Sequence, residues 1–97
     1  MVRAKLVYRS KLFYPDGAIR EMVIWQLPIK APDRHHGLKY RLYYGNAKGK
    51  CLVRYDNESG KGDHKHIAGK EELYRFITVE KLVEDFQKDI DRLRRSK

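Results

Sequence analysis

The segment from Tyr55 to Gly69 gathers side chains that could do chemistry. It follows an apolar run and carries few hydrophobic side chains of its own. Within 11 residues it places seven ionisable groups: Asp56, Glu58, Lys61, Asp63, His64, Lys65 and His66. Such a mixture is costly to leave unpaired and is common at functional sites. We therefore expect residues 56–69 to form a polar functional loop.

Two histidines in this segment suit the cleavage of a phosphodiester. If the chain is extended there, His64 and His66 point to the same side. An imidazole titrates near neutral pH, so one ring can accept the proton of a 2′-hydroxyl and the other can donate one to the leaving oxygen. Lys61 and Arg41 would bind the scissile phosphate and stabilise its charge. Asp63 would orient a histidine, which completes the predicted catalytic set.

The same residue types allow two other interpretations. A His-x-His pair could bind a metal ion, with Asp56 or Glu58 completing the ligands around His64 and His66. The protein would then be a metal-dependent nuclease. Alternatively, the histidines only hydrogen-bond a long surface loop. Our prediction follows the metal-independent chemistry and includes no cofactor.

The charge of the chain indicates the kind of partner. Its 97 residues include 22 Lys and Arg against 13 Asp and Glu, for a formal net charge of +9. Residues 1–54 hold 12 basic and 3 acidic side chains, whereas residues 55–97 hold 10 of each. A basic surface attracts polyanions and releases their condensed counterions. Nucleic acid, and RNA in particular, is the expected partner.

Basic and aromatic side chains alternate along the predicted strands. Such interleaving is typical of surfaces that stack bases and bind phosphates. The alternative is a sheet with a tyrosine-rich core face and a solvated basic face. Nucleic-acid contacts are predicted at five residues: Arg34, Lys39, Tyr43, Arg54 and Lys65.

Size and cysteine content set further limits. A chain of 97 residues has room for a single domain. Cys51 is the sole cysteine, so no internal disulfide can form, which fits a reducing cytosol. No apolar run approaches the ~18 residues of a membrane-spanning helix. We expect a cytoplasmic protein with no membrane contact; its oligomeric state stays open.

Hydrophobic periodicity predicts an α+β fold. Strands with period-two alternation are expected over residues 3–14, 18–27, 38–44 and 50–55, with a further short strand over 73–77. Apolar residues then recur at three- and four-residue steps, which predicts a helix over residues 79–94 with Thr78 as its N-cap. The predicted architecture is a four- to five-stranded antiparallel sheet with one C-terminal helix packed on one face.

Three segments resemble the TumE family of toxins from prokaryotic type II toxin–antitoxin modules. They are PDGAIREMVIWQLP (Pro15 to Pro28), HGLKYRLYY (His36 to Tyr44) and YDNESGKGDHKHIAGKEELYRF (Tyr55 to Phe76). The resemblance implies a small toxic effector that is neutralised by a cognate helix-turn-helix antitoxin protein. It assigns no catalytic residue. RNA cleavage follows by analogy with other compact toxins.

The resulting hypothesis is a toxin that acts as a small endoribonuclease with histidine, lysine and arginine chemistry. The alternatives are a non-enzymatic basic module that binds nucleic acid or protein, and a metal-dependent nuclease.

Overall fold

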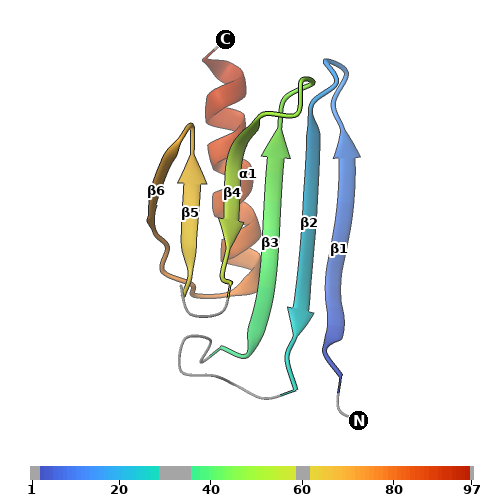
Figure 1. The fold of residues 1–97 in the computed structure, drawn as a ribbon, viewed down its shortest axis with the longest axis vertical. Helices are drawn as coiled ribbons and strands as arrows, with labels where there is room; N and C mark the ends of the chain where they lie inside the picture. Colours follow the sequence, from blue (N-terminus) through green and yellow to red (C-terminus); the bar gives the residue numbers. More distant parts are fainter. Residues whose placement is uncertain (1–2, 29–35, 59–61, 97) are drawn as a thin grey trace.

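The computed structural model describes residues 3–28, 36–58 and 62–96. In these residues six strands form a single sheet, and a helix follows them (Figure 1). Neighbouring strands are antiparallel and lie in chain order. The elements are β1 (Lys5–Phe13), β2 (Ile19–Gln26), β3 (Leu38–Gly45), β4 (Cys51–Asp56), β5 (His64–Ile67), β6 (Lys70–Leu73) and α1 (Val79–Arg95).

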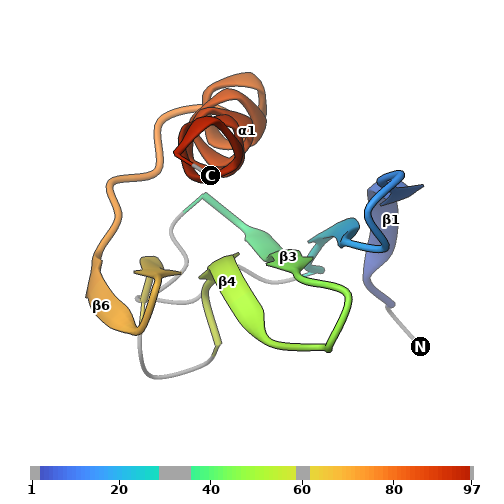
Figure 2. The same cartoon turned by 90° about the horizontal axis from the view of Figure 1, so that it is seen from above.

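Helix α1 packs on one face of the sheet and leaves the other face uncovered (Figure 2). The core lies between them, and its members alternate along the strands. Tyr40, Leu42 and Tyr44 of β3 are buried, whereas Lys39 and Arg41, which alternate with them, are exposed. The helix contributes the fully buried residues Leu82, Phe86 and Ile90. The predicted α+β class is therefore confirmed, with more strands than expected.

Thr78 begins the helix as predicted. Its hydroxyl accepts a hydrogen bond from the Lys81 backbone N–H at 3.0 Å, which satisfies one of the donors that a helix N-terminus leaves free. At the other end, Arg94 donates to the Tyr44 hydroxyl at 2.7 Å and lies 3.2 Å from Asp16. These contacts fix the end of the helix beside the turn between β1 and β2.

Two predictions about residues 56–77 were wrong. The expected polar loop over residues 56–69 contains strand β5, and β6 occupies residues 70–73 in place of a strand over 73–77. The reason is a tight hairpin turn at Ala68 and Gly69, whose φ angles of 49° and 88° suit a two-residue connection. β5 pairs through its backbone with β4, so it needs few apolar side chains.

Three tyrosines connect the core to carboxylates around it. Tyr40 donates to Asp63 at 2.8 Å, Tyr74 donates to Asp85 at 2.7 Å, and Tyr55 donates to Asp89. Burial is the main cause that raises the pKa of each phenol above its usual value, and the bond to the carboxylate raises the pKa further. The folded protein therefore keeps these three protons at alkaline pH.

This proton retention predicts how stability changes with pH. Below about pH 10 both states hold the tyrosine protons; above it only the unfolded state loses them, so stability falls as pH rises. The buried Tyr40 and Tyr55 together contribute a slope of about 2.7 kcal/mol per pH unit. Urea unfolding between about pH 9 and 11.5 measures it. The Tyr55→Phe variant should lower the measured slope by about 1.4 kcal/mol per pH unit, and an unchanged slope in that variant would contradict the assignment.

Candidate functional site

The uncovered face of the sheet carries most of the side chains selected from the sequence. Direct cross-strand pairs face the same side of a sheet. One row runs Arg41–Asp56–His64 across β3, β4 and β5, and the next runs Tyr43–Arg54–His66. Their neighbours Leu42, Val53 and Tyr55 point to the helix side. We call this surface the open face.

Strands β1 and β2 extend the open face. Lys39 pairs with Trp25, Arg41 pairs with Val23, and Val23 in turn pairs with Arg9 of β1. Within residues 3–28, 36–58 and 62–96, no helix or strand covers this side (Figure 2). The open face therefore combines cations, aromatic rings and imidazoles on a surface that a ligand can approach.

Asp56 organises the centre of this surface. It is 6% exposed; its Oδ2 lies 3.1 Å from Nε of Arg54, and its Oδ1 lies 2.5 Å from Nε2 of His64. The Asp56 Oδ1 and Arg54 Nε atoms make no hydrogen bond of good angle. Charge, more than hydrogen-bond direction, therefore holds Arg54 against Asp56.

His64 has both ring nitrogens facing acceptors. Nδ1 lies 3.1 Å from the carbonyl oxygen of Gly62, and Nε2 faces the Asp56 carboxylate. Contacts at both ring nitrogens fix the orientation of this imidazole. His64 is also 5% exposed. It is therefore best suited to hold Asp56 and the start of strand β5 in place.

His66 is in a different state. It is partly exposed and lies between Arg54 and Glu71 in the cross-strand order. In the part of the chain that the structure describes, its ring makes no hydrogen bond or ion pair. Its nitrogens are thus available to a ligand on the open face.

Two cations on β3 are also available. Among the described residues, neither Lys39 nor Arg41 makes an ion pair. The Arg41 guanidinium lies 5.2 Å from the centroid of the Tyr43 ring. Such a contact orients the guanidinium and leaves its donors free.

A hollow of about 570 Å³ opens beside these cations. Its volume is in the range of small-molecule sites. The walls come from β2, β3 and the end of β4: Val23, Trp25, Lys39, Tyr40, Arg41, Asp56 and Glu58. Trp25 is not among the site residues predicted from the sequence, because its place on the open face depends on the pairing of β2 with β3.

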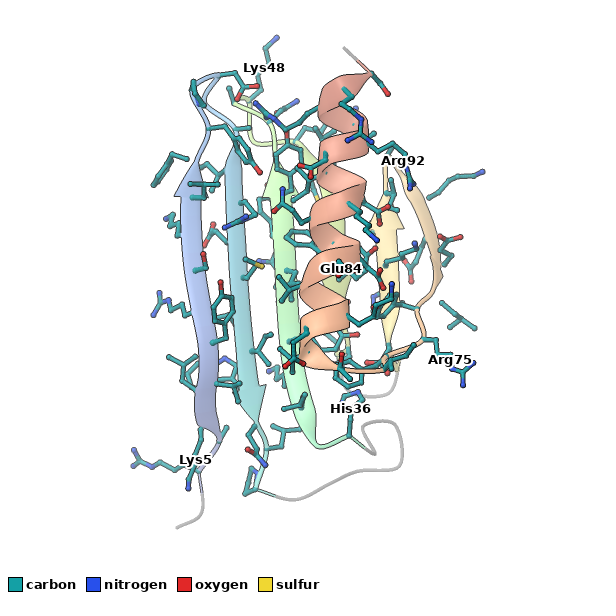
Figure 3. The ribbon with its side chains drawn as sticks, turned by 180° about the vertical axis from the view of Figure 1, so that it is seen from behind. Lys5, His36, Lys48, Arg75, Glu84 and Arg92 are labelled. Atoms are coloured by element: carbon teal, nitrogen blue, oxygen red, sulfur yellow. The ribbon has the colours of Figure 1, made fainter. Side chains whose placement is uncertain are left out.

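Asp63 orients a histidine, but a different one from those in the predicted pair. It accepts from His36 at 3.1 Å and from the Tyr40 hydroxyl at 2.8 Å. Nδ1 of His36 accepts from the Leu38 N–H, so Nε2 carries the proton that is donated to Asp63. His36 lies at one end of the sheet, near the start of α1 (Figure 3). This cluster is separate from the open face.

Other predicted residues do not join the open face. Lys65 points to the helix side, where its Nζ lies 3.4 Å from Glu72 and 3.7 Å from Asp89. Lys61 and Arg34 lie outside the described residues.

The proposed metal ligands do not assemble. Asp56 and His64 are in contact, yet within the described ranges no three His, Cys, Asp or Glu side chains are arranged to hold a metal ion. The donor set on the open face therefore gives no support to the metal-dependent alternative. In the same ranges, no helix has the length and apolar content needed to cross a membrane.

Removal of the Asp56 carboxylate should destabilise the fold. The Asp56→Ala variant leaves Arg54 and His64 without their shared carboxylate partner, at an expected cost of about 2–3 kcal/mol. This is less than for a fully buried pair, because Arg54 is partly exposed. Urea unfolding checks the value. The exposed Glu71→Ala on β6 is the control, with a change below about 0.5 kcal/mol. Equal effects of the two substitutions would contradict the central role of Asp56.

Comparison with known proteins identifies the family of this chain. A family model described as Toxin TumE matches residues 2–94. No curated protein and no solved structure matches the chain. The match covers nearly the whole chain and confirms the resemblance seen in the three segments. The chain therefore belongs to the TumE toxin family and is the toxin component of a toxin–antitoxin system.

Proposed function

We propose that this toxin binds and cleaves RNA on the open face of its sheet. The observation that carries the proposal is the grouping of unpaired cations with an available imidazole. Lys39, Arg41 and His66 lie on one uncovered surface. A polyanion with a reactive hydroxyl beside each phosphate suits this combination of groups.

The phosphate lies over the middle of the sheet. Arg41 and Arg54 occupy neighbouring positions on β3 and β4 and present planar guanidinium groups, which match phosphate geometry. The Asp56 carboxylate orients Arg54, since its Oδ2 lies 3.1 Å from Nε of Arg54. The two guanidinium groups bind the phosphate and stabilise the negative charge that builds on it in the transition state. Lys39 attracts the adjoining backbone.

His66 moves the protons. It takes the proton of the 2′-hydroxyl as that oxygen attacks the phosphorus atom. The bond between phosphorus and the 5′-oxygen breaks, and His66 returns a proton to this leaving oxygen. The products are a 2′,3′-cyclic phosphate and a 5′-hydroxyl. His64, which the sequence analysis paired with His66, acts here as a positioning residue through Asp56. The reaction needs no metal ion.

A second candidate is a non-enzymatic module that binds RNA. The observation that favours it is the engagement of both ring nitrogens of His64. Only His66 then remains to transfer protons, whereas binding by Lys39 and Arg41 needs no proton transfer. In both cases the protein acts in the cytoplasm and is neutralised by an antitoxin of the helix-turn-helix type.

Cleavage of single-stranded RNA in EDTA tests the proposal. The toxin should produce 2′,3′-cyclic phosphate ends, and His66→Ala should lower the rate by about 10²–10⁴-fold. Arg41→Ala should lower it by about 10²-fold, since the transition state loses a charge partner. Lys88→Ala, an exposed change on the helix, is the control that keeps full activity.

The outcomes separate the two candidates. Salt-sensitive RNA binding that is lost in Arg41→Ala, with no cleavage, would establish the binding module in place of the enzyme. A protein that neither binds nor cleaves RNA would overturn both.

A further inference from the structure

The hollow on the open face is lined by aromatic, basic and acidic side chains, and this combination limits which ligand can bind there. Trp25 supplies an aromatic wall, Lys39 and Arg41 supply cations, and Asp56 and Glu58 supply carboxylates. The carboxylates make the hollow itself unfavourable for a phosphate, whose charge they would repel. A flat, uncharged group with N–H donors fits better, while its phosphate lies outside near the cations. A nucleotide has these properties when its base lies inside the hollow and its phosphate lies outside.

Glu58 is the carboxylate in the hollow that is free to bind. It is exposed, and in the described parts of the chain it makes no hydrogen bond or ion pair. Asp56, by contrast, is already engaged with Arg54 and His64. A carboxylate can accept two parallel hydrogen bonds through its two oxygens. It therefore selects a ligand with two adjacent N–H donors on one edge.

Among the four RNA bases, guanine has this edge. Its N1–H and its N2 amino group are adjacent donors on the Watson–Crick side. Adenine and cytosine each present one amino donor beside a ring-nitrogen acceptor, and uracil presents one N–H between two acceptors. Single-stranded RNA is commonly recognised by stacking on an aromatic ring with hydrogen bonds to this edge. Trp25 provides the stacking surface at the same hollow.

We infer that the hollow is a guanine subsite, in which Trp25 stacks on the base and Glu58 accepts from its N1–H and N2 amino group. The inference rests on the proposed RNA function and adds its base specificity. Arg41 lies at the boundary between the hollow and the row that contains His64, so it can bind the phosphate attached to this nucleotide. Cleavage would then occur next to guanosine.

The sole tryptophan of the chain gives a direct test. Guanosine monophosphate should quench the fluorescence of Trp25 at concentrations about 10- to 100-fold lower than the adenosine, cytidine and uridine monophosphates. Inosine monophosphate lacks the N2 amino group and should bind about tenfold more weakly than guanosine monophosphate. Glu58→Gln should abolish the preference. Glu71→Gln, also on the open face but outside the hollow, should keep it.

The results distinguish this inference from the proposed function. Equal quenching by all four nucleotides, or an unchanged preference in Glu58→Gln, overturns the guanine subsite even if RNA is cleaved. A Glu58-dependent guanine preference in a protein that leaves RNA intact supports the subsite and refutes the catalysis.

A separate observation concerns β1, which lies at the edge of the sheet. Its large apolar residues are exposed: Leu6, Val7, Tyr8, Leu12 and Phe13. On the helix side, a mainly apolar groove of about 360 Å³ lies between Val7 and Tyr8 on β1 and Val79 and Val83 on α1, with Glu80 as its one charged lining residue. Edge strands of this kind bind another chain through their free backbone groups and exposed side chains.

The charge of β1 decides which chain fits. Residues 3–13 include four basic and no acidic side chains. Antiparallel pairing of two copies would bring like charges together, which is unfavourable. An acidic chain is complementary, and a toxin–antitoxin system supplies a protein partner. We propose that an acidic, extended segment of the antitoxin pairs with β1 and places apolar side chains in the groove.

Binding of the purified antitoxin tests this surface. Val7→Ser and Val83→Ser should each weaken the complex by about tenfold or more, because they remove apolar contact area in the groove. Leu73→Ser is the matched control, since Leu73 is an exposed apolar residue on the opposite edge strand. Unchanged affinity in both groove variants would overturn the proposal. So would a free toxin dimer that these variants dissociate while antitoxin affinity stays the same.

Discussion

Helix α1 is too narrow to cover the sheet, and this constraint explains the distribution of side chains. A helix is about 10 Å wide with its side chains, whereas strands lie about 4.8 Å apart, so six strands span about 24 Å. The helix therefore buries the middle of one face, where Met22, Leu42 and Val53 lie. The edges of that face and the whole open face must be stable in contact with water or a ligand.

The open face meets this condition with charge that is only partly paired. Asp56 is buried there together with His64, and it contacts both Arg54 and His64. Lys39 and Arg41 keep no carboxylate within ion-pair distance among the described residues. Pairing of exposed charges contributes little to stability, so folding does not require a carboxylate beside either cation. Both cations are therefore available to the polyanionic ligand proposed above.

The sequence predicted the parts of the fold that depend on local periodicity. The period-two alternation predicted over residues 38–44 and the cap at Thr78 are both confirmed, because burial and capping act within a few residues. The pairing of Asp63 with His36 joins residues 27 positions apart, so no local sequence pattern predicts it. Strand β5 was missed because backbone pairing, and not apolar content, makes it a strand.

Strand β5 also explains why His64 and His66, which belong to one His-x-His pattern, differ in their contacts. Alternation correctly predicted that His64 and His66 share a side, and it also implied that Lys65 faces the other way. It could not predict the cross-strand partners, which are Asp56 for His64 and Arg54 for His66. The Asp56 carboxylate engages the His64 ring, whereas among the described residues His66 makes no hydrogen bond or ion pair. The identity of the β4 residue opposite each histidine therefore decides which imidazole is engaged within the sheet and which is available for the proton transfer proposed above.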